Sequence, residues 1–296
     1  AIGGVINIIT RKGRGEPRAS IQIEGGSYGT LSTVMSLSGG TSSFSYALAL
    51  AAARSEGFSA YGYRIRDLEA KYGPFDKDGF RRFAGSARFA WRPSDAVEIE
   101  AGLYGGQLRS DYDAAFAGFG FLPDTPSFLR SRVTTAYVRA TADAFDGLLR
   151  NRVTLYGSET DRKNYDVQRT NFGFGITDEF NRYDFRGRRL GVEYQGDLRL
   201  GAFGKFTFGG GVERESAHTA TLPGQNSFNL NESASYSRNN GSLFALYQTT
   251  LFDRLDLSFG GRVDKADGVR AFVTGRATAA YRIEETGTKL RASVGT

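Results

Sequence analysis

The chain has 296 residues and a formal net charge of +6, with 38 Lys and Arg residues scattered among 32 Asp and Glu residues. It contains no cysteine, which excludes zinc–thiolate sites, disulfides and thiol catalysis, and the scattered charges give little support to nucleic-acid binding. The longest apolar run, residues 47–53, is far shorter than the roughly 20 residues of a membrane-spanning helix.

The chain opens on an apolar stretch, AIGGVINII at residues 1–9, which Arg11 and Lys12 follow. After it, a two-residue alternation of apolar and polar positions predicts about thirteen strands. They are expected near residues 17–27, 30–40, 43–54, 80–92, 97–104, 131–142, 147–160, 189–200, 205–215, 236–251, 254–264, 269–281 and 288–296.

The lengths of these segments separate two classes of all-β protein. Strands of globular proteins usually have about five or six residues, whereas a tilted strand that crosses a bilayer needs roughly 9 to 11. Short turns near 39–42, 93–95, 145–147, 252–254 and 284–287 alternate with long polar loops near 55–79, 108–130, 161–181 and 216–235. This asymmetry predicts an antiparallel transmembrane β-barrel with its turns toward the periplasm and its loops outside.

A sheet in lipid has to close on itself, because hydrocarbon offers no partner for backbone N–H and C=O groups. Thirteen is an odd number, whereas bacterial single-chain barrels have even counts, and the last predicted strand stops at residue 296. We therefore expect the sequence to be a piece of a larger barrel.

Residues 1–9 and the basic pair after them resemble the end of the plug domain in TonB-dependent outer-membrane receptors. The segment LDLSFGGRVD at residues 255–264 is similar to a mid-barrel strand of that family. The alternative for residues 1–9 is an ordinary buried strand with a bulge at Gly3 and Gly4. The resemblance implies that residues 1–13 end a plug and residues 14–296 begin a barrel, with about 13 of an expected 22 strands.

The same resemblance implies a location in the outer membrane of a Gram-negative bacterium, within lipid and lipopolysaccharide. It implies energy-coupled uptake of a scarce chelate, powered by the TonB complex of the inner membrane through a segment outside this sequence. No catalysis is expected, and the single His218 lies in a predicted loop without a recognisable serine partner.

The loops are most similar to those of the cobalamin receptors within this family. FDKDGF at residues 75–80, SDYDAAF at residues 110–116 and Leu122-Pro123-Asp124 carry this closer match. By resemblance, the ligands of loop-ordering calcium ions are Asp76, Asp78, Tyr112 through its backbone carbonyl, Asp113 and Asp124. Calcium takes six to eight oxygen ligands, so an ion between acidic loops turns their repulsion into attraction.

One expected carboxylate is missing, because a Gly-Tyr-Asp stretch of those receptors is Gly57-Phe58-Ser59 here, with Asp67 or Glu69 as substitutes. The alternative for Asp76 and Asp78 is a pair of solvated loop acids that shape a turn. No cofactor is required, and calcium remains an optional ion that orders the loops.

Cobalamin is the leading substrate and a ferric siderophore the alternative. The loop aromatics Tyr61, Tyr63, Phe116 and Phe119 are candidate contacts for a large, partly apolar ligand, or they pack only their own loops. Arginines at 189, 270, 276 and 282 alternate onto the polar face. Pairing with plug acids, contact with lipopolysaccharide phosphates and simple hydration of the lumen are all open for them.

Three other classes share parts of this pattern. A diffusion porin has the same alternation but lacks a plug strand, an outer-membrane enzyme needs a catalytic constellation, and a soluble β-sandwich has no need for alternating loop lengths. The plug-like opening at residues 1–9 is the feature that favours a receptor over a porin.

Overall fold

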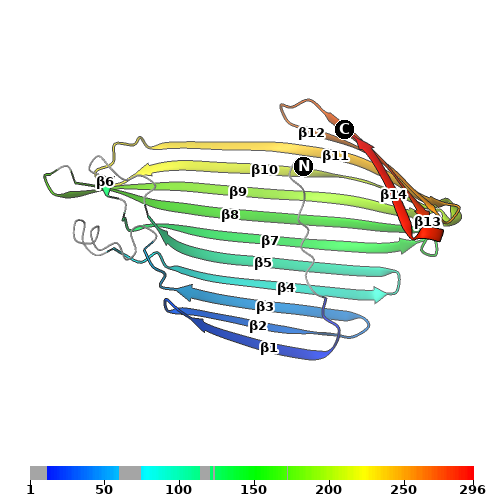
Figure 1. Ribbon diagram of the computed structural model, residues 1–296, viewed down its shortest axis with the longest axis horizontal. Helices are drawn as coiled ribbons and strands as arrows, with labels where there is room; N and C mark the ends of the chain where they lie inside the picture. The colour runs from blue at the N-terminus through cyan, green and yellow to red at the C-terminus, as the bar shows by residue number, and fades with distance from the viewer. Residues whose placement is uncertain (1–11, 60–74, 114–120, 123, 172) are drawn as a thin grey trace.

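The computed structural model describes residues 12–59, 75–113, 121–122, 124–171 and 173–296. Within these residues, thirteen consecutive antiparallel neighbours form one open, curved sheet, and the two-residue strand β6 pairs with β8 beside this path (Figure 1). The strands are β1 (Gly15–Gly26), β2 (Thr30–Gly40), β3 (Phe44–Ser55), β4 (Phe80–Ser94), β5 (Val97–Tyr112), β6 (Phe121–Leu122), β7 (Ser127–Ala144), β8 (Leu149–Asn171), β9 (Ile176–Arg199), β10 (Lys205–Pro223), β11 (Glu232–Leu251), β12 (Leu255–Ala266), β13 (Phe272–Ile283) and β14 (Thr288–Gly295).

Two three-residue 3-10 helices, Gly201–Phe203 and Glu284–Thr286, lie in the connections after β9 and β13. Among the described residues, no helix has the length and apolar character needed to cross a membrane.

The prediction of an all-β antiparallel architecture with about thirteen long strands is confirmed. The prediction of a long loop at residues 161–181 is wrong, because β8 and β9 stay paired from Leu149 opposite Leu198 to Asn171 opposite Ile176. Backbone pairing does not require apolar side chains, so the loss of alternation marks where the strands leave the hydrocarbon and not where the sheet ends. For the same reason β5, β7, β10 and β11 extend into the loops predicted at 108–130 and 216–235.

Every connection at one end of the sheet is short, whereas the long β3–β4 and β5–β7 connections lie at the other end, beside the short β1–β2 and β8–β9 connections (Figure 1). Two of the short turns have the same backbone conformation. Phe145 and Asp146 have positive φ values of 54° and 55°, and Phe252 and Asp253 have values of 53° and 55°. Paired positive φ values are the signature of a turn whose twist matches the twist of its strands. The connections β3–β4 and β5–β7 lie at the opposite end and carry the candidate site.

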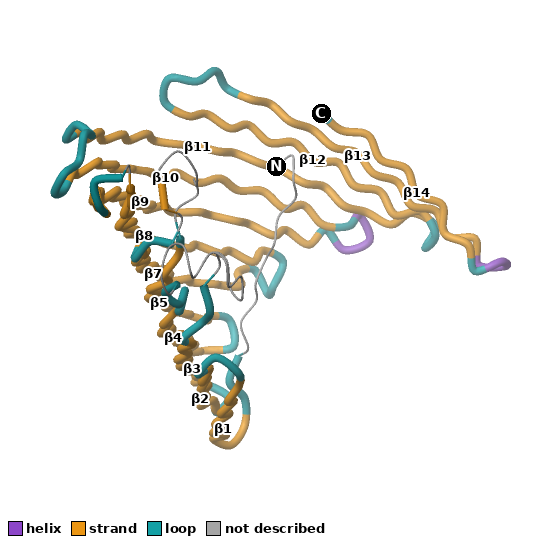
Figure 2. Tube along the Cα trace, turned by 60° about the vertical axis from the view of Figure 1, so that its left-hand side comes forward, coloured by secondary structure: helices purple, strands orange, loops and turns teal. Residues whose placement is uncertain are grey.

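The sheet has an apolar face and a polar face. On β8 the side chains of Val153 and Leu155 are 44 % and 52 % exposed, and Val138 on β7, directly opposite Leu155, is 49 % exposed. Only Ala90 and Val167 are fully buried apolar residues in the described part of the chain. The apolar surface is therefore the outer face, whose natural solvent is lipid, and the interior is polar. Figure 2 shows how the sheet curves from β1 to β14.

Aromatic side chains mark the short-turn end of the outer face. Phe44 on β3 lies 6.3 Å from Tyr46 and 6.4 Å from Phe89 between ring centroids, and Trp91 sits directly opposite Phe44 on β4. Aromatic belts of this kind are typical of the membrane–water interface. They place this end of the strands at one surface of the bilayer.

The inner face is held together by ion pairs. Glu100 on β5 is almost fully buried, and its carboxylate accepts hydrogen bonds from Arg88 at 2.5 Å and from the Tyr137 hydroxyl at 2.7 Å. The Lys12 ammonium lies 2.9 Å from Glu98 and 3.6 Å from Glu100. The chain just before β1 is thus attached to the inner wall, whereas residues 1–11, which include the plug-like stretch, lie outside the described residues.

We expect the side-chain direction to decide the cost of a buried charge. Leu155→Arg on the outer face should lower the free energy of unfolding by about 2 to 4 kcal/mol, because it places a cation in hydrocarbon. Thr135→Arg on the inner face of β7 is the matched control and should change it by less than about 1 kcal/mol, because its side chain faces water. Denaturant unfolding of the full-length protein in lipid vesicles measures both, and equal effects would contradict this assignment of faces.

Candidate functional site

Three carboxylates meet at the long-loop end of the sheet. Asp76 and Asp78 come from the β3–β4 connection, and Asp113 follows the last residue of β5. One oxygen from each of the three lies within 4.8 Å of the others. The structure therefore brings together residues from two loops that are separate in the sequence. We call Asp76, Asp78 and Asp113 the acidic cluster.

Hydrogen bonds from backbone N–H groups, both between and within the two loops, position the cluster. The Asp76 N–H donates to the Asp124 carboxylate at 3.1 Å, and the Asp111 N–H at the end of β5 donates to the Gly79 carbonyl at 2.9 Å. Within the β5–β7 connection, the Thr125 N–H donates to the Asp113 carboxylate at 3.1 Å. The first two bonds link the β3–β4 connection to β5 and to the loop that follows it.

Two glycines let the acidic loop lie against the end of β3. Gly57 has a φ of +69°, and a Cβ there would lie 2.0 Å from the Asp78 carbonyl oxygen. A Cβ on Gly79 would lie 2.7 Å from the Ser55 carbonyl oxygen. Only glycine fits such close backbone contacts, so Gly57 and Gly79 fix where Asp78 can sit.

The cluster is electrostatically strained. Burial, together with the neighbouring carboxylates of Asp124, Asp113 and Asp78, raises the pKa of Asp76 to about 7. Burial raises the pKa of Asp113 to about 6, with further contributions from Asp78 and Asp124, although the hydrogen bond from Thr125 opposes them. Burial is also the main cause of the raised pKa of Asp124. Carboxylates that lose water and face one another resist ionisation unless a cation joins them.

The donor set suits a hard divalent cation. Calcium binds oxygens at 2.3–2.6 Å, so two oxygens of its shell lie at most about 5 Å apart, and the three clustered carboxylates meet this limit. Asp113 Oδ2 is buried and has no hydrogen-bond partner among the residues that the structure describes. Asp76, Asp78 and Asp113 would hold the ion and leave several positions of its shell for carbonyl oxygens or water.

Two of the five predicted ligands have a different arrangement. The Asp124 carboxylate accepts a hydrogen bond from the Asp76 N–H. The backbone carbonyl of Asp124 accepts a hydrogen bond from Arg169 at 3.4 Å. The Tyr112 hydroxyl donates to Asp166, so its side chain is engaged elsewhere while its carbonyl precedes Asp113 in the chain. The structure thus brings three of the predicted ligands together directly and keeps Asp124 and Tyr112 beside them.

A buried hydroxyl pair supports the loop that carries Asp113 and Asp124. Thr125 and Ser127 are only 1 % and 2 % exposed, and their hydroxyls lie 2.9 Å apart. Ser127 also accepts a hydrogen bond from the Val167 N–H at 2.9 Å. These contacts attach the β5–β7 connection to β8.

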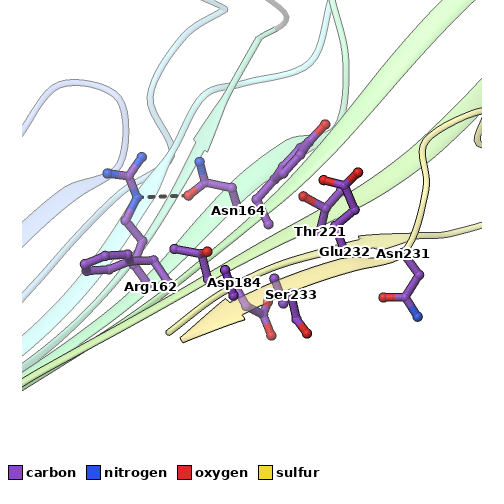
Figure 3. Close-up of a pocket in the computed structure, with 12 residues that line it drawn as sticks. Arg162, Asn164, Asp184, Thr221, Asn231, Glu232 and Ser233 are labelled. Atoms are coloured by element: carbon purple, nitrogen blue, oxygen red, sulfur yellow. Dashed lines mark hydrogen bonds between the residues drawn. The ribbon is translucent and has the colours of Figure 1, made fainter. Parts of the chain in front are cut away.

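A cavity of about 890 Å³ opens on the inner side of β8 to β11 near the same end of the sheet. Figure 3 shows side chains from all four strands around it, with the hydrogen bond of 3.0 Å from Arg162 to Asn164 drawn as a dashed line. Its lining is mixed, since Tyr183 and Phe185 supply rings while Glu232 supplies a carboxylate. Ligand pockets usually have volumes of about 300 to 1,000 Å³ and a similar mixture of apolar walls and a few polar groups.

The sequence did not single out this cavity. Most of its lining residues on β8, β10 and β11 fall in the loops predicted at 161–181 and 216–235, whereas Tyr183 and Phe185 lie between that first loop and the strand predicted at 189–200. The alternation of Tyr183 and Phe185 with charged neighbours is the signal that could have extended that strand. The predicted substrate contacts Tyr61, Tyr63, Phe116 and Phe119 lie outside the described residues.

Arg189, one of the arginines predicted for the polar face, lies on the inner wall. Its guanidinium is 3.0 Å from Glu213 and 2.8 Å from Glu215 on β10. It is therefore part of the wall's own ion pairs.

A comparison with known protein families identifies the family of this chain. The chain belongs to the TonB-dependent receptor family, because the family described as TonB dependent receptor-like, beta-barrel matches residues 54–296. It is accordingly part of an outer-membrane β-barrel, and the match favours this family over the diffusion porins.

Solved structures share the fold at low sequence identity. The copper transporter OprC superposes with a TM-score of 0.71 at 15% identity, over 97% of this chain and 46% of that chain. The siderophore receptor PirA from Acinetobacter baumannii gives 0.69 at 13% identity, over 98% of this chain and 44% of that chain. The RagAB peptide transporter gives 0.63 at 14% identity, over 90% of this chain and 36% of that chain.

This chain therefore spans less than half the length of each of these transporters. No sequence among the curated proteins matches it at a significant level.

Ser127→Ala should loosen the loop that carries the acidic cluster. The substitution leaves the buried Val167 N–H without its acceptor, which costs about 1 to 3 kcal/mol. We expect faster amide hydrogen exchange in residues 124–128 and at Val167 of the full-length protein, measured by mass spectrometry. Ser131→Ala, four residues along β7, is the control, and faster exchange in both variants would contradict this role of Ser127.

Proposed function

We propose that this chain forms part of a receptor that binds a scarce chelate at its extracellular end and takes it up with energy delivered by the TonB complex. The chelate of first choice is cobalamin, and the binding loops are ordered by calcium. The observation that carries this proposal is the meeting of Asp76, Asp78 and Asp113 from two loops that the sequence related to cobalamin receptors.

The acidic cluster supports the calcium part of the proposal in two ways. Its carboxylates repel one another without a cation, and burial together with this repulsion raises the pKa of Asp76. An ion shared by Asp76 and Asp113 would join the β3–β4 and β5–β7 connections, which the hydrogen bond from the Asp76 N–H to the Asp124 carboxylate already links. The ion would supply positive charge and nothing more, while the loops that it joins would cover the bound chelate.

The cavity on the inner side of β8 to β11 supports the binding part. It opens toward the interior at the same end as the acidic cluster, so a ligand held there lies beneath the loops. Arg162 offers a guanidinium and Tyr183 an aromatic ring on its wall. A large chelate with polar groups around a rigid centre fits such a mixed surface.

Transport itself needs differential binding. A bound chelate can change the state of a plug only if its affinity differs between two plug arrangements. We place this coupling between the inner wall of the barrel and the chain before β1, where Lys12 already pairs with Glu98.

Calcium dependence tests the proposal most directly. We expect Asp76→Asn with Asp113→Asn to weaken cobalamin binding by the full-length protein about tenfold or more, and EDTA to have the same effect on the unchanged protein. Asp111→Asn is the matched control, because Asp111 pairs with Arg109 at 3.1 Å and lies outside the cluster. Equilibrium binding with and without added calcium measures all three.

The outcomes separate the parts of the proposal. Cobalamin binding that ignores both EDTA and the double substitution would refute the calcium site while leaving the substrate in place. Binding of iron chelates in place of cobalamin would refute the substrate.

A ferric siderophore is the second candidate substrate. The structural relatives include the siderophore receptor PirA and the pyoverdine receptor FpvA from Pseudomonas aeruginosa, the latter with a TM-score of 0.68 at 11% identity. Many iron chelates carry negative charge, and Arg162 is a cation on the cavity wall. The same binding measurement, made with ferric chelates in parallel, decides between the two substrates.

Arg162→Ala should weaken binding of the preferred chelate about tenfold, because a charged hydrogen bond across a partly buried cavity contributes more than a neutral one. Lys163→Ala is the control, since the next side chain along β8 faces the outer side of the sheet. Titration of the full-length protein with the chelate gives both affinities. A larger loss for the Lys163 variant would show that the cavity is not the binding site.

A further inference from the structure

Three carboxylates face the interior at the long-loop end of β8 to β11. Glu232 on β11 belongs to the lining of the chelate cavity, as Figure 3 shows. Asp166 on β8 has the parity of Asn164, and Glu179 on β9 has the parity of Tyr183, so both share the face of a lining residue. We call Asp166, Glu179 and Glu232 the mouth carboxylates.

Asp166 lies between the cavity and the outside of the cell. Asn164 and Tyr183 are opposite each other at the cavity, and Asp166 and Asn181 form the next inward pair, about 7 Å nearer to the long-loop end. The Asn229 side chain joins the two levels, because its amide donates to Asn181 at 2.9 Å and to the Tyr183 hydroxyl at 3.4 Å. A ligand that enters the cavity from outside therefore passes this level first.

Hydrogen bonds hold two of the mouth carboxylates in place without neutralising them. The Tyr112 hydroxyl donates to Asp166. Glu179 accepts hydrogen bonds from the Asn181 amide at 3.0 Å and from the Ser227 hydroxyl at 3.2 Å. Asn181 is only 8 % exposed, so this support is itself fixed. All these donors are uncharged, and the negative charges of Asp166 and Glu179 remain.

Few cations balance these charges. Arg162 is the one cation among the described lining residues, and its guanidinium donates to the Asn164 side chain at 3.0 Å. Asp184, a further lining residue, lies 3.0 Å from Arg182. Within the part of the chain that the structure describes, no Lys or Arg forms an ion pair with a mouth carboxylate. A ligand thus meets three carboxylates and a single guanidinium.

The remaining polar lining is uncharged. Rings of Tyr183 and Phe185 form part of the wall. The hydroxyl and amide groups come from Asn164, Thr219, Thr221, Asn231 and Ser233. Such groups both donate and accept hydrogen bonds, so they suit a ligand whose own polar groups are amides or hydroxyls.

We propose that the mouth carboxylates select the ligand of this cavity by charge, so that neutral and cationic chelates bind and anionic chelates are excluded. This inference rests on the proposed function, because it names the charge class of the ligand held in the same cavity. An anionic group is repelled by carboxylates that no cation neutralises, and such repulsion is an effective means of rejecting a wrong ligand. An ammonium group gains charge-assisted hydrogen bonds from the same oxygens.

The experiment uses two series of probes that differ in charge. The first consists of cobalamin, a derivative with one side-chain amide converted to a carboxylate, and a derivative in which that amide carries a terminal ammonium. The second is a ferric trihydroxamate whose terminal amine is free, acetylated or succinylated, which makes the chelate cationic, neutral or anionic. Equilibrium binding to the full-length protein is measured for each probe at low and high salt.

Two triple variants isolate the role of the mouth carboxylates. One removes their charges and keeps their size, with the substitutions Asp166→Asn, Glu179→Gln and Glu232→Gln. The control makes the same change of net charge at the short-turn end, with Asp253→Asn, Glu284→Gln and Glu285→Gln. Glu232→Gln alone is a further variant that decides the result if the first triple variant fails to fold. Its carboxylate accepts no hydrogen bond from the described residues, so folding does not depend on it.

We expect the unchanged protein and the control to bind the neutral member of a series about tenfold or more tightly than the anionic member. The triple variant of the mouth carboxylates should bind these two members within about threefold of each other, and Glu232→Gln should give an intermediate ratio. Added salt should strengthen binding of the anionic probes to the unchanged protein, because it screens the repulsion.

Each outcome bears on a different part of the argument. Anionic probes that bind the unchanged protein as tightly as neutral ones, or a ratio that the substitutions leave unchanged, would overturn the inference. If the trihydroxamates follow the expected order while no cobalamin probe binds, the charge selection stands and cobalamin is refuted as the substrate. Binding of neither series would overturn both.

Discussion

The structure depends on one constraint: a backbone that crosses hydrocarbon has to find all its hydrogen-bond partners within the protein. Long antiparallel strands satisfy this constraint and leave side chains to alternate between two solvents. Leu155 enters lipid while Thr154 and Tyr156 on the same strand face the interior. The chain consequently has its apolar surface outside and its buried polar groups inside, with Glu100 as the clearest example.

The same alternation decides which face of the sheet carries each charged side chain. On the inner wall, several arginines pair with carboxylates, as Arg88 does with Glu100 and Arg189 with Glu213. At the long-loop end, Asp76, Asp78 and Asp113 concentrate negative charge in the loops.

The acidic loops project from the ends of strands that the sheet holds in register. Asp76 and Asp78 precede β4 and Asp113 follows β5, so the pairing of β4 with β5 brings the three carboxylates close together. The cavity on the inner side of β8 to β11 lies at the same end of the sheet.

The sequence by itself determined the number, order and orientation of the strands, because a two-residue alternation is a local property that lipid imposes on every strand. It also identified Asp76, Asp78 and Asp113 as related residues. It did not reveal that β8 and β9 continue through residues 161–181, because polar side chains hide a pairing that only the backbone makes. Only the tertiary structure decided which residues are neighbours across strands. Arg54 lies opposite Arg81, and Arg130 lies opposite Lys163. Only register, which depends on pairing between distant segments, brings such residues together.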